Sequence, residues 1–270
     1  MPTRQEYPSL RQGLVGSWCP SLGASGLSLI DRSGRGNHGT LTNMGGQDNW
    51  RASGSGVALN FDGTDDLALI SSSQPYQFAS GQSFTASAWI YPASNKNHSI
   101  ISFGNNGWDI YVAIGNYLEF AKTNVVNAGS TAATNAVPLN KWTHMAITNV
   151  VGSTVEFFIN GVSVRSTAFT SSYTYTTEFR LGSTHNQTLA WNGQLDDMRV
   201  YSRALTPAEI RLIASRRGIG LTPLPDRSAG LPRKLSVNVG GTWCAADAHL
   251  NVGGTWKLAQ ASTNVAGTWR

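Results

Sequence analysis

Carboxylates and aromatic rings are the side chains of this sequence that could act on or bind a ligand. Hydrolysis of a glycosidic bond needs two carboxyl groups, about 5 Å apart in retaining enzymes and further apart in inverting ones. Acids two residues apart on a β-strand share one face. None of the five glutamates has a carboxylate two residues away: Glu6, Glu119, Glu156, Glu178 and Glu209. We therefore expect a protein without enzymatic activity.

Aromatic residues near turns offer a second kind of chemistry, because an exposed ring can stack on the apolar face of a sugar. Trp108, Tyr111 and Trp191 occupy such positions and are the candidate glycan contacts. The alternative is that these rings belong to the core of a β-sandwich. Three other tryptophans are expected in the core: Trp18, Trp89 and Trp142.

Other reactive groups give weaker signals. Asp62, Asp65 and Asp66 favour a turn, because short carboxylate side chains bond to nearby backbone groups. His144 falls inside an expected strand, which favours a buried residue of the sheet over a metal ligand. The sequence has no Gly-x-Ser-x-Gly motif, no zinc-type Cys/His spacing and no Lys-Ser/Thr after its glycine-rich loop. Nucleophilic catalysis, zinc binding and phosphate binding are therefore not expected.

The composition is typical of a turn-rich β protein. Only 13% of the 270 residues are charged, and glycine occurs 29 times. The net charge is +5, and many basic residues lie between positions 199 and 234. They indicate either contact with an acidic partner or a solvated helix face and linker. No arginine-rich block alternates with aromatic residues, so nucleic-acid binding is not expected. Cys19 and Cys244 are expected as separate thiols, with a disulfide between them as the alternative.

Residues 1–12 are polar, and no apolar run approaches the roughly 18 residues of a membrane span. We expect synthesis in a host cytoplasm without a secretion signal, and no contact with a membrane.

Apolar residues at every second position predict short strands from residue 13 to residue 201. The segment 84–91 alternates cleanly and ends at Pro92, and Asn160-Gly161 is a strong hairpin signal. About a dozen such strands predict an antiparallel sandwich. One helix is expected after Thr206, which forms a capping box with Glu209.

The last part of the chain repeats one phrase three times. Asn-Val-Gly-Gly-Thr-Trp occurs at 238–243 and 251–256, and Asn-Val-Ala-Gly-Thr-Trp at 264–269. The glycines predict tight turns, and each repeat predicts a small β-hairpin. An isolated hairpin is only marginally stable in water. We therefore expect Trp243, Trp256 and Trp269 to dock on a neighbour.

Several phrases in the body of the chain resemble the laminin-G-like members of the concanavalin A-like lectin/glucanase superfamily. They are Gly-Leu-Val-Gly-Ser-Trp (13–18), Asp-x-Ser-Gly-x-Gly-Asn-His-Gly (31–39), Leu-x-Phe-Asp-Gly-x-Asp-Asp (59–66), Phe-Thr-x-Ser-x-Trp-Ile (84–90), Trp-Thr-His (142–144), Phe-Ile-Asn-Gly (158–161) and the segment 193–210. The resemblance covers about 13–215. It implies an all-β fold, a two-sheet antiparallel jelly-roll sandwich with one short C-terminal helix.

The resemblance also implies a metal. In calcium-binding relatives, an aspartate of the last strand and a loop carbonyl hold a structural ion, and by position these are Asp196 and the carbonyl of Gly63. The alternative is that Asp196 accepts backbone hydrogen bonds. No other cofactor is implied.

The C-terminal repeats resemble segments of phage structural and tail proteins, which implies a virion component. We expect an arm at 1–12, a jelly-roll domain at 13–218, a linker at 219–233 and a docking tail at 234–270. The leading hypothesis is a non-enzymatic virion protein, a capsid decoration or a head or tail appendage, that contacts other virion proteins and forms a homo-oligomer such as a trimer. The alternatives are a glycan-binding adhesion module and, third, a glycoside hydrolase.

Overall fold

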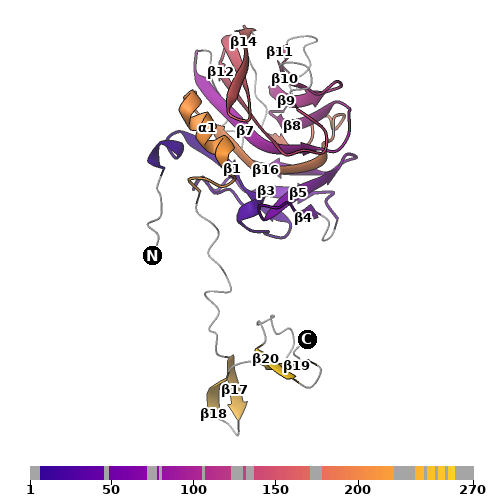
Figure 1. Ribbon diagram of the computed structural model, residues 1–270, viewed down its shortest axis with the longest axis vertical. Helices are drawn as coiled ribbons and strands as arrows, with labels where there is room; N and C mark the ends of the chain where they lie inside the picture. Colours follow the sequence, from indigo (N-terminus) through magenta and orange to yellow (C-terminus); the bar gives the residue numbers. More distant parts are fainter. Residues whose placement is uncertain are drawn as a thin grey trace. The chain divides into compact units, whose positions relative to one another are not determined.

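The computed structural model describes residues 7–45, 49–71, 78, 81–104, 107–122, 130–131, 137–170, 178–221, 235–239, 242–246, 249–252 and 255–258. The chain divides into two compact units, Met1–Thr222 and Pro223–Arg270. The larger unit holds two antiparallel sheets and a short helix (Figure 1).

Sheet A of the larger unit has the strand order β14-β13-β12-β7-β16-β5-β4, and β1 pairs with the end of β16. Every strand pair in it is antiparallel. Its strands are β1 (Leu14–Trp18), β4 (Trp50–Ala52), β5 (Val57–Asp62), β7 (Ser83–Pro92), β12 (Thr143–Val150), β13 (Ser153–Ile159), β14 (Val162–Phe169) and β16 (Asn192–Tyr201).

Sheet B has the strand order β11-β10-β9-β8-β15-β6-β3-β2, again with antiparallel pairs throughout. Its strands are β2 (Ser28–Leu29), β3 (Gly39–Thr42), β6 (Leu67–Ile70), β8 (His98–Ser102), β9 (Trp108–Ala113), β10 (Tyr117–Lys122), β11 (Ser130–Thr131) and β15 (Phe179–Leu181).

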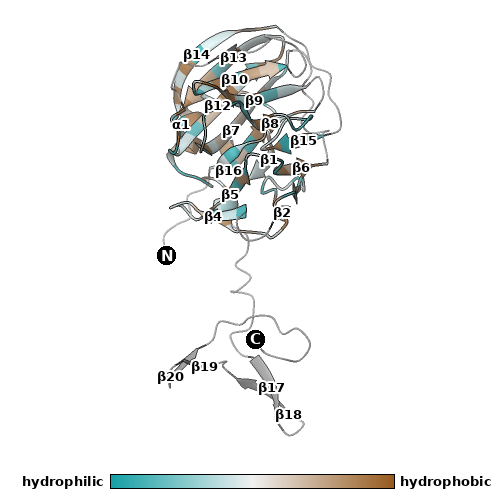
Figure 2. Cartoon of the chain, turned by 90° about the vertical axis from the view of Figure 1, so that its right-hand side faces the viewer, coloured by the Kyte–Doolittle hydropathy of each residue, from teal (hydrophilic) through white to brown (hydrophobic). Residues whose placement is uncertain are grey.

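The main core lies between the two sheets and follows from the period-two pattern of the strands. In β7, Phe84, Ala86, Ala88 and Ile90 all belong to this core, so the residues between them lie on the outer face of sheet A. Figure 2 shows hydrophobic and hydrophilic residues mixed along the strands of both sheets, as such alternation requires.

A second apolar cluster covers part of the outer face of sheet A. Helix α1 (Pro207–Ser215) places Ile210 and Ile213 there, against Ala146 and Phe158 of the sheet. Thr206 caps the helix: its hydroxyl accepts a hydrogen bond from the Glu209 amide at 3.3 Å, and the Glu209 carboxylate accepts one from the Thr206 amide at 2.9 Å. The described part of this unit also contains two 3₁₀ turns, η1 (Pro8–Leu10) and η2 (Pro20–Leu22).

The predicted sandwich and the predicted capping box are therefore confirmed. The compact unit extends beyond the expected 13–218 at both ends. Leu10 comes from the expected arm, Ile219 and Leu221 come from the expected linker, and all three are buried in the second cluster. The helices of the described part of the chain are too short and too polar to cross a membrane.

The smaller unit contains two antiparallel hairpins at the first two repeats. They are β17 (Leu235–Val239) with β18 (Thr242–Ala246), and β19 (His249–Val252) with β20 (Thr255–Leu258). Val239 pairs with Thr242 and Val252 pairs with Thr255, and the Gly-Gly pairs between them lie outside the described residues. Trp243 and Trp256 are each the second residue of the second strand of a hairpin. Trp269 lies outside the described residues.

Candidate functional site

Two of the predicted glycan contacts are buried in the core. Trp108 and Trp191 are each 0% exposed. Trp108 shares the inward face of β9 with Ile110 and Val112, and its ring stacks on Phe103 at 3.6 Å. The prediction that Trp108 and Trp191 present rings to a sugar is therefore wrong, and the core alternative holds.

The reverse correction applies to Trp89 and Trp142, which were expected in the core. Both are only partly buried, and neither belongs to the apolar cluster between the sheets. Trp89 follows the inward-facing Ala88 and precedes the inward-facing Ile90, so it lies on the outer face of sheet A. Trp18, by contrast, is fully buried, as predicted.

The half-buried side chains Trp142, Tyr91, Gln194 and Asn60 form a row across this outer face, which we call the aromatic–amide row. The strand register brings them together, because Gln194 pairs with both Tyr91 and Asn60. The rings of Tyr91 and Trp142 are 5.5 Å apart. Within the described residues, the side-chain oxygen Oε1 of Gln194 has no hydrogen-bond partner. The row thus joins two aromatic rings to two amides.

Arg217, from the segment after α1, borders the row at its aromatic end. Its guanidinium carbon lies 3.7 Å from the centroid of the Trp142 ring and 5.2 Å from that of Trp89. Its Nη1 donates to the Ser53 hydroxyl at 2.9 Å and contacts Asp196 Oδ2 at 3.5 Å. Only 6% of the side chain is exposed, so the cation is held in place by the two indole rings.

Next to Arg217, a bulge in β16 buries two acids. Asp196 Oδ1 accepts the backbone amides of Ser21 and Asp197 at 3.1 and 2.8 Å. Asp197 adopts a left-handed φ of 47° and forms a bidentate pair with Arg199, with distances of 2.7 and 2.8 Å. Burial, and then repulsion from Asp197, raise the pKa of Asp196 to about 6. These contacts make the bulge a structural support for Arg217.

The calcium site implied by the family resemblance does not fit this geometry. Gly63 directly follows Asp62, which pairs with Asn192, whereas Asp196 lies four residues further along β16. At about 3.3 Å per residue, the two are more than about 13 Å apart. The Gly63 carbonyl accepts a hydrogen bond from Lys96 Nζ at 2.8 Å. Asp196 instead accepts backbone amides, the alternative given by its sequence, so the two groups cannot share one ion.

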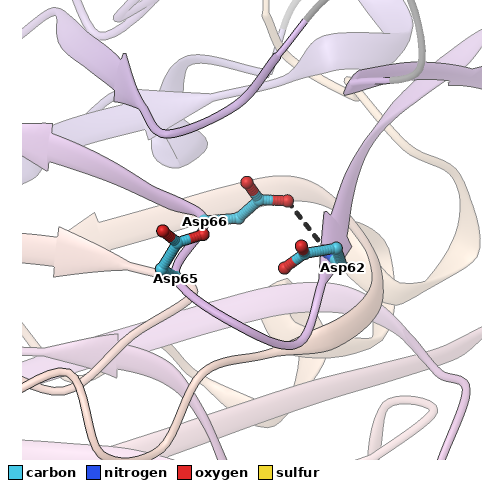
Figure 3. A group of neighbouring side chains, drawn as sticks. All are labelled: Asp62, Asp65 and Asp66. Carbon is cyan, nitrogen blue, oxygen red and sulfur yellow. Dashed lines mark hydrogen bonds between the residues drawn. The ribbon is translucent and has the colours of Figure 1, made fainter.

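The acidic turn after β5 gathers three carboxylates, from Asp62, Asp65 and Asp66, whose oxygens lie within 4.8 Å of one another (Figure 3). Asp66 Oδ2 accepts the Asp62 amide at 2.8 Å, and Asp62 Oδ1 accepts the Thr64 amide at 2.7 Å. These bonds confirm that Asp62 and Asp66 form the turn. Asp62 and Asn60 share one face of β5, so the acidic turn lies beyond the amide end of the aromatic–amide row.

Tyr111, the remaining predicted glycan contact, lies on the outer face of sheet B and is half-buried. Glu119 is its cross-strand partner and accepts a hydrogen bond from its hydroxyl. Burial, and then this bond, raise the pKa of Tyr111. Asp109 lies on the same strand and the same face as Tyr111, and Glu119 lies on that face of the neighbouring strand β10. A cross-strand acid is therefore near Glu119, and spacing along the sequence could not reveal it.

His144 is buried beside Trp89, its cross-strand partner. The two rings meet edge-on, with centroids 5.6 Å apart. Burial, reinforced by the positive charge of Arg199, lowers the pKa of His144 to about 3, so the ring is neutral near pH 7. The prediction of a buried sheet residue is confirmed, although Nδ1 has no hydrogen-bond partner in the described part of the chain. Cys19 is also buried and is not in a disulfide.

The comparisons with known proteins agree with this architecture. Residues 61–211, more than half of the chain, match the family model of the concanavalin A-like lectin/glucanases superfamily. A search of curated proteins found no match.

Three solved structures share the fold at low sequence identity. The binding domain of Paraclostridial Mosquitocidal Protein 1 gives a TM-score of 0.60 at 19% identity over 76% of this chain and 52% of that one. The ligand binding domain of botulinum neurotoxin serotype D, in complex with N-acetylneuraminic acid, gives 0.58 at 16% identity over 77% and 52%. Domain 4 of an extracellular arabinanase from Geobacillus stearothermophilus, in complex with arabinotriose, gives 0.57 at 23% identity over 74% and 98%. The chain thus spans about half the length of the toxin domains.

Proposed function

Because this chain belongs to the concanavalin A-like lectin/glucanase superfamily, we propose that its jelly-roll domain is a non-catalytic carbohydrate-binding module. We further propose that the aromatic–amide row is its glycan-binding face. The observation that carries the proposal is the alignment of Trp142, Tyr91, Gln194 and Asn60 across the outer face of sheet A.

The chemistry of the row suits a sugar. A pyranose ring has apolar faces of C–H groups and a rim of hydroxyls. Tyr91 and Trp142 offer aromatic surface for the faces, and the amides of Gln194 and Asn60 both donate and accept hydrogen bonds from hydroxyls.

A matched pair of tyrosine variants tests the assignment. The full chain is assayed on a glycan array, and hits are measured by calorimetry. We expect Tyr91→Ala to weaken binding about tenfold, or roughly 1.4 kcal/mol, because the variant loses aromatic surface that packs on the sugar. Tyr111→Ala, on the opposite sheet, is expected to bind normally. Loss of binding in the Tyr111 variant alone would place the glycan on sheet B, and a blank array would refute the lectin proposal.

The absence of catalysis is tested on sheet B, where Glu119 and Asp109 share a face. Diagonal neighbours on adjacent strands are about 7–8 Å apart, within the range of inverting glycosidases. However, Tyr111 shares this face with both acids, and its hydroxyl bonds to Glu119. We expect no release of reducing sugar from polysaccharides. Release that disappears in Glu119→Gln would show that the domain is an enzyme.

The two described hairpins of the smaller unit favour a second role, display of this domain on a virion. We propose that the repeats attach the chain to other capsid or tail proteins and join copies of the chain, in a trimer or another homo-oligomer. A two-stranded hairpin is too small to be stable alone, so the repeats need a surface to cover them. A chain ending at residue 222 is expected to fold but not to enter particles. Normal incorporation of that chain would exclude the docking role.

A further inference from the structure

Only one nitrogen of the Arg217 guanidinium group makes hydrogen bonds within the described residues. Both of its hydrogen bonds use Nη1, to Ser53 and, at the limit of 3.5 Å, to Asp196. Within the described residues, Nε and Nη2 make no hydrogen bond, and neither is among the fully buried unpaired atoms. Both therefore retain contact with solvent, although the side chain as a whole is almost completely enclosed.

The same protein shows what this free edge can bind. Arg199 uses Nε and Nη2 together to hold the two oxygens of the Asp197 carboxylate at 2.7 and 2.8 Å. This side-on arrangement is the planar, bidentate match between guanidinium and carboxylate. In Arg199 the edge is filled by the chain's own acid. In Arg217 the corresponding edge has no hydrogen-bond partner among the described residues.

The position of Arg217 connects this edge to the aromatic–amide row. Its guanidinium lies on the ring of Trp142, the first member of the row. The stacking on Trp142 and Trp89 and the bond to Ser53 fix the position of the Arg217 side chain. Binding of a ligand would therefore cost little side-chain entropy at this residue.

The two ends of the aromatic–amide row carry charges of opposite sign. Arg217 stands at the aromatic end, where the exposed Lys141 precedes Trp142, whereas the acidic turn of Asp62, Asp65 and Asp66 lies beyond the amide end. An acidic ligand would be attracted at the first end and repelled at the second.

We propose that the row selects sugars that carry a carboxylate, with the carboxylate bound side-on by Nε and Nη2 of Arg217. The inference rests on the proposed glycan-binding function and adds the ligand class. Uronic acids and sialic acids share this group, and the test below distinguishes them.

The experiment compares acidic and neutral ligands on the full chain by calorimetry. The pairs are glucuronate-containing and glucose oligosaccharides of equal length, and sialyllactose and lactose. We expect one acidic member to bind at least tenfold more tightly than its neutral partner. Its methyl ester should bind like the neutral sugar, because the ester has lost the charge and one acceptor. The pair that shows the preference identifies the source of the carboxylate.

Variants locate the effect. Arg217→Lys keeps the charge but loses the planar edge, and we expect the acidic preference to fall about tenfold, since charge-assisted hydrogen bonds are worth roughly 1.5–3 kcal/mol. The quantity compared is the ratio of acidic to neutral affinity, and a cooperative urea unfolding transition would show that the variant is folded. Arg216→Gln, at the exposed neighbouring position, is the matched control and should keep the preference.

Each outcome separates the two proposals. Equal binding of acidic and neutral sugars would overturn the role of Arg217 and leave the glycan-binding face intact. A preference that survives Arg217→Lys unchanged, or that disappears in Arg216→Gln, would also overturn it. Failure of the native chain to bind any sugar would overturn both.

Discussion

Replacing His144 by phenylalanine should make the larger unit more resistant to acid. The folded state holds the pKa of this histidine at about 3, against an ordinary value of 6.5. The unfolded chain therefore binds a proton that the folded chain rejects. Stability is complete above about pH 6.5 and is lost progressively as the pH falls toward 3. At about pH 4.5, two units below the ordinary value, the loss is about 3 kcal/mol at roughly 1.36 kcal/mol per unit.

Protonation of Asp196 has the opposite effect on stability and partly offsets this loss. Its folded pKa is about 6, against an ordinary value of 3.8, so the folded state takes up the proton first. Stability from this group rises as the pH falls from about 6 to about 4, and the gain at about pH 4.5 is about 2 kcal/mol. In the native chain the two effects together leave a loss of about 1 kcal/mol at this pH.

Urea unfolding at neutral pH and at about pH 4.5, followed by tryptophan fluorescence, separates the two groups. His144→Phe removes only the loss, so this variant should become more stable on acidification. Asp196→Asn removes only the gain, so this variant should become less stable, by about 3 kcal/mol relative to its own value at neutral pH. The reasoning is refuted if the native chain and both variants show parallel pH profiles.

Two further variants test packing and capping. Trp108→Ala should destabilise the larger unit by about 3–5 kcal/mol in urea unfolding, because it empties a fully buried site. Tyr91→Ala on the outer face should cost less than about 1 kcal/mol. Similar values for the two variants would contradict the assignment of core and surface rings. Thr206→Ala should cost about 1 kcal/mol of stability by removing the cap of α1. Thr206→Ser keeps the hydroxyl and should retain most of this stability in thermal melting. An equal loss in both variants would argue that the hydroxyl does not cap the helix.

The fold was predictable because its signals are local. Alternation in the segment 84–91, the Asn160-Gly161 turn and the capping box of Thr206 and Glu209 each specify one element from a few neighbouring residues, and all three occur in the structure. The two hairpin pairings of the first two repeats follow from the same kind of local signal.

The candidate site was less predictable, for two different reasons. The aromatic assignments failed because nearness to a turn was given more weight than alternation. The inward positions of Ile110 and Val112 would have placed Trp108 inside, and those of Ala88 and Ile90 would have placed Trp89 outside. Arg217 could not have been found this way. It reaches Trp142 from a distant segment, and only the packing of α1 and the bulge at Asp196 sets its position.

The place of β16 in sheet A has a consequence for how the chain is made. This late strand lies between β5 and β7, and it also receives β1, which is paired through Leu14 with Tyr201. A ribosome therefore releases most of sheet A before the strand that joins its halves exists. Until then β5 and β7 have open edges, which are prone to join other chains. Nascent chains stopped before residue 192 should depend on chaperones, and folding should complete in a single late step.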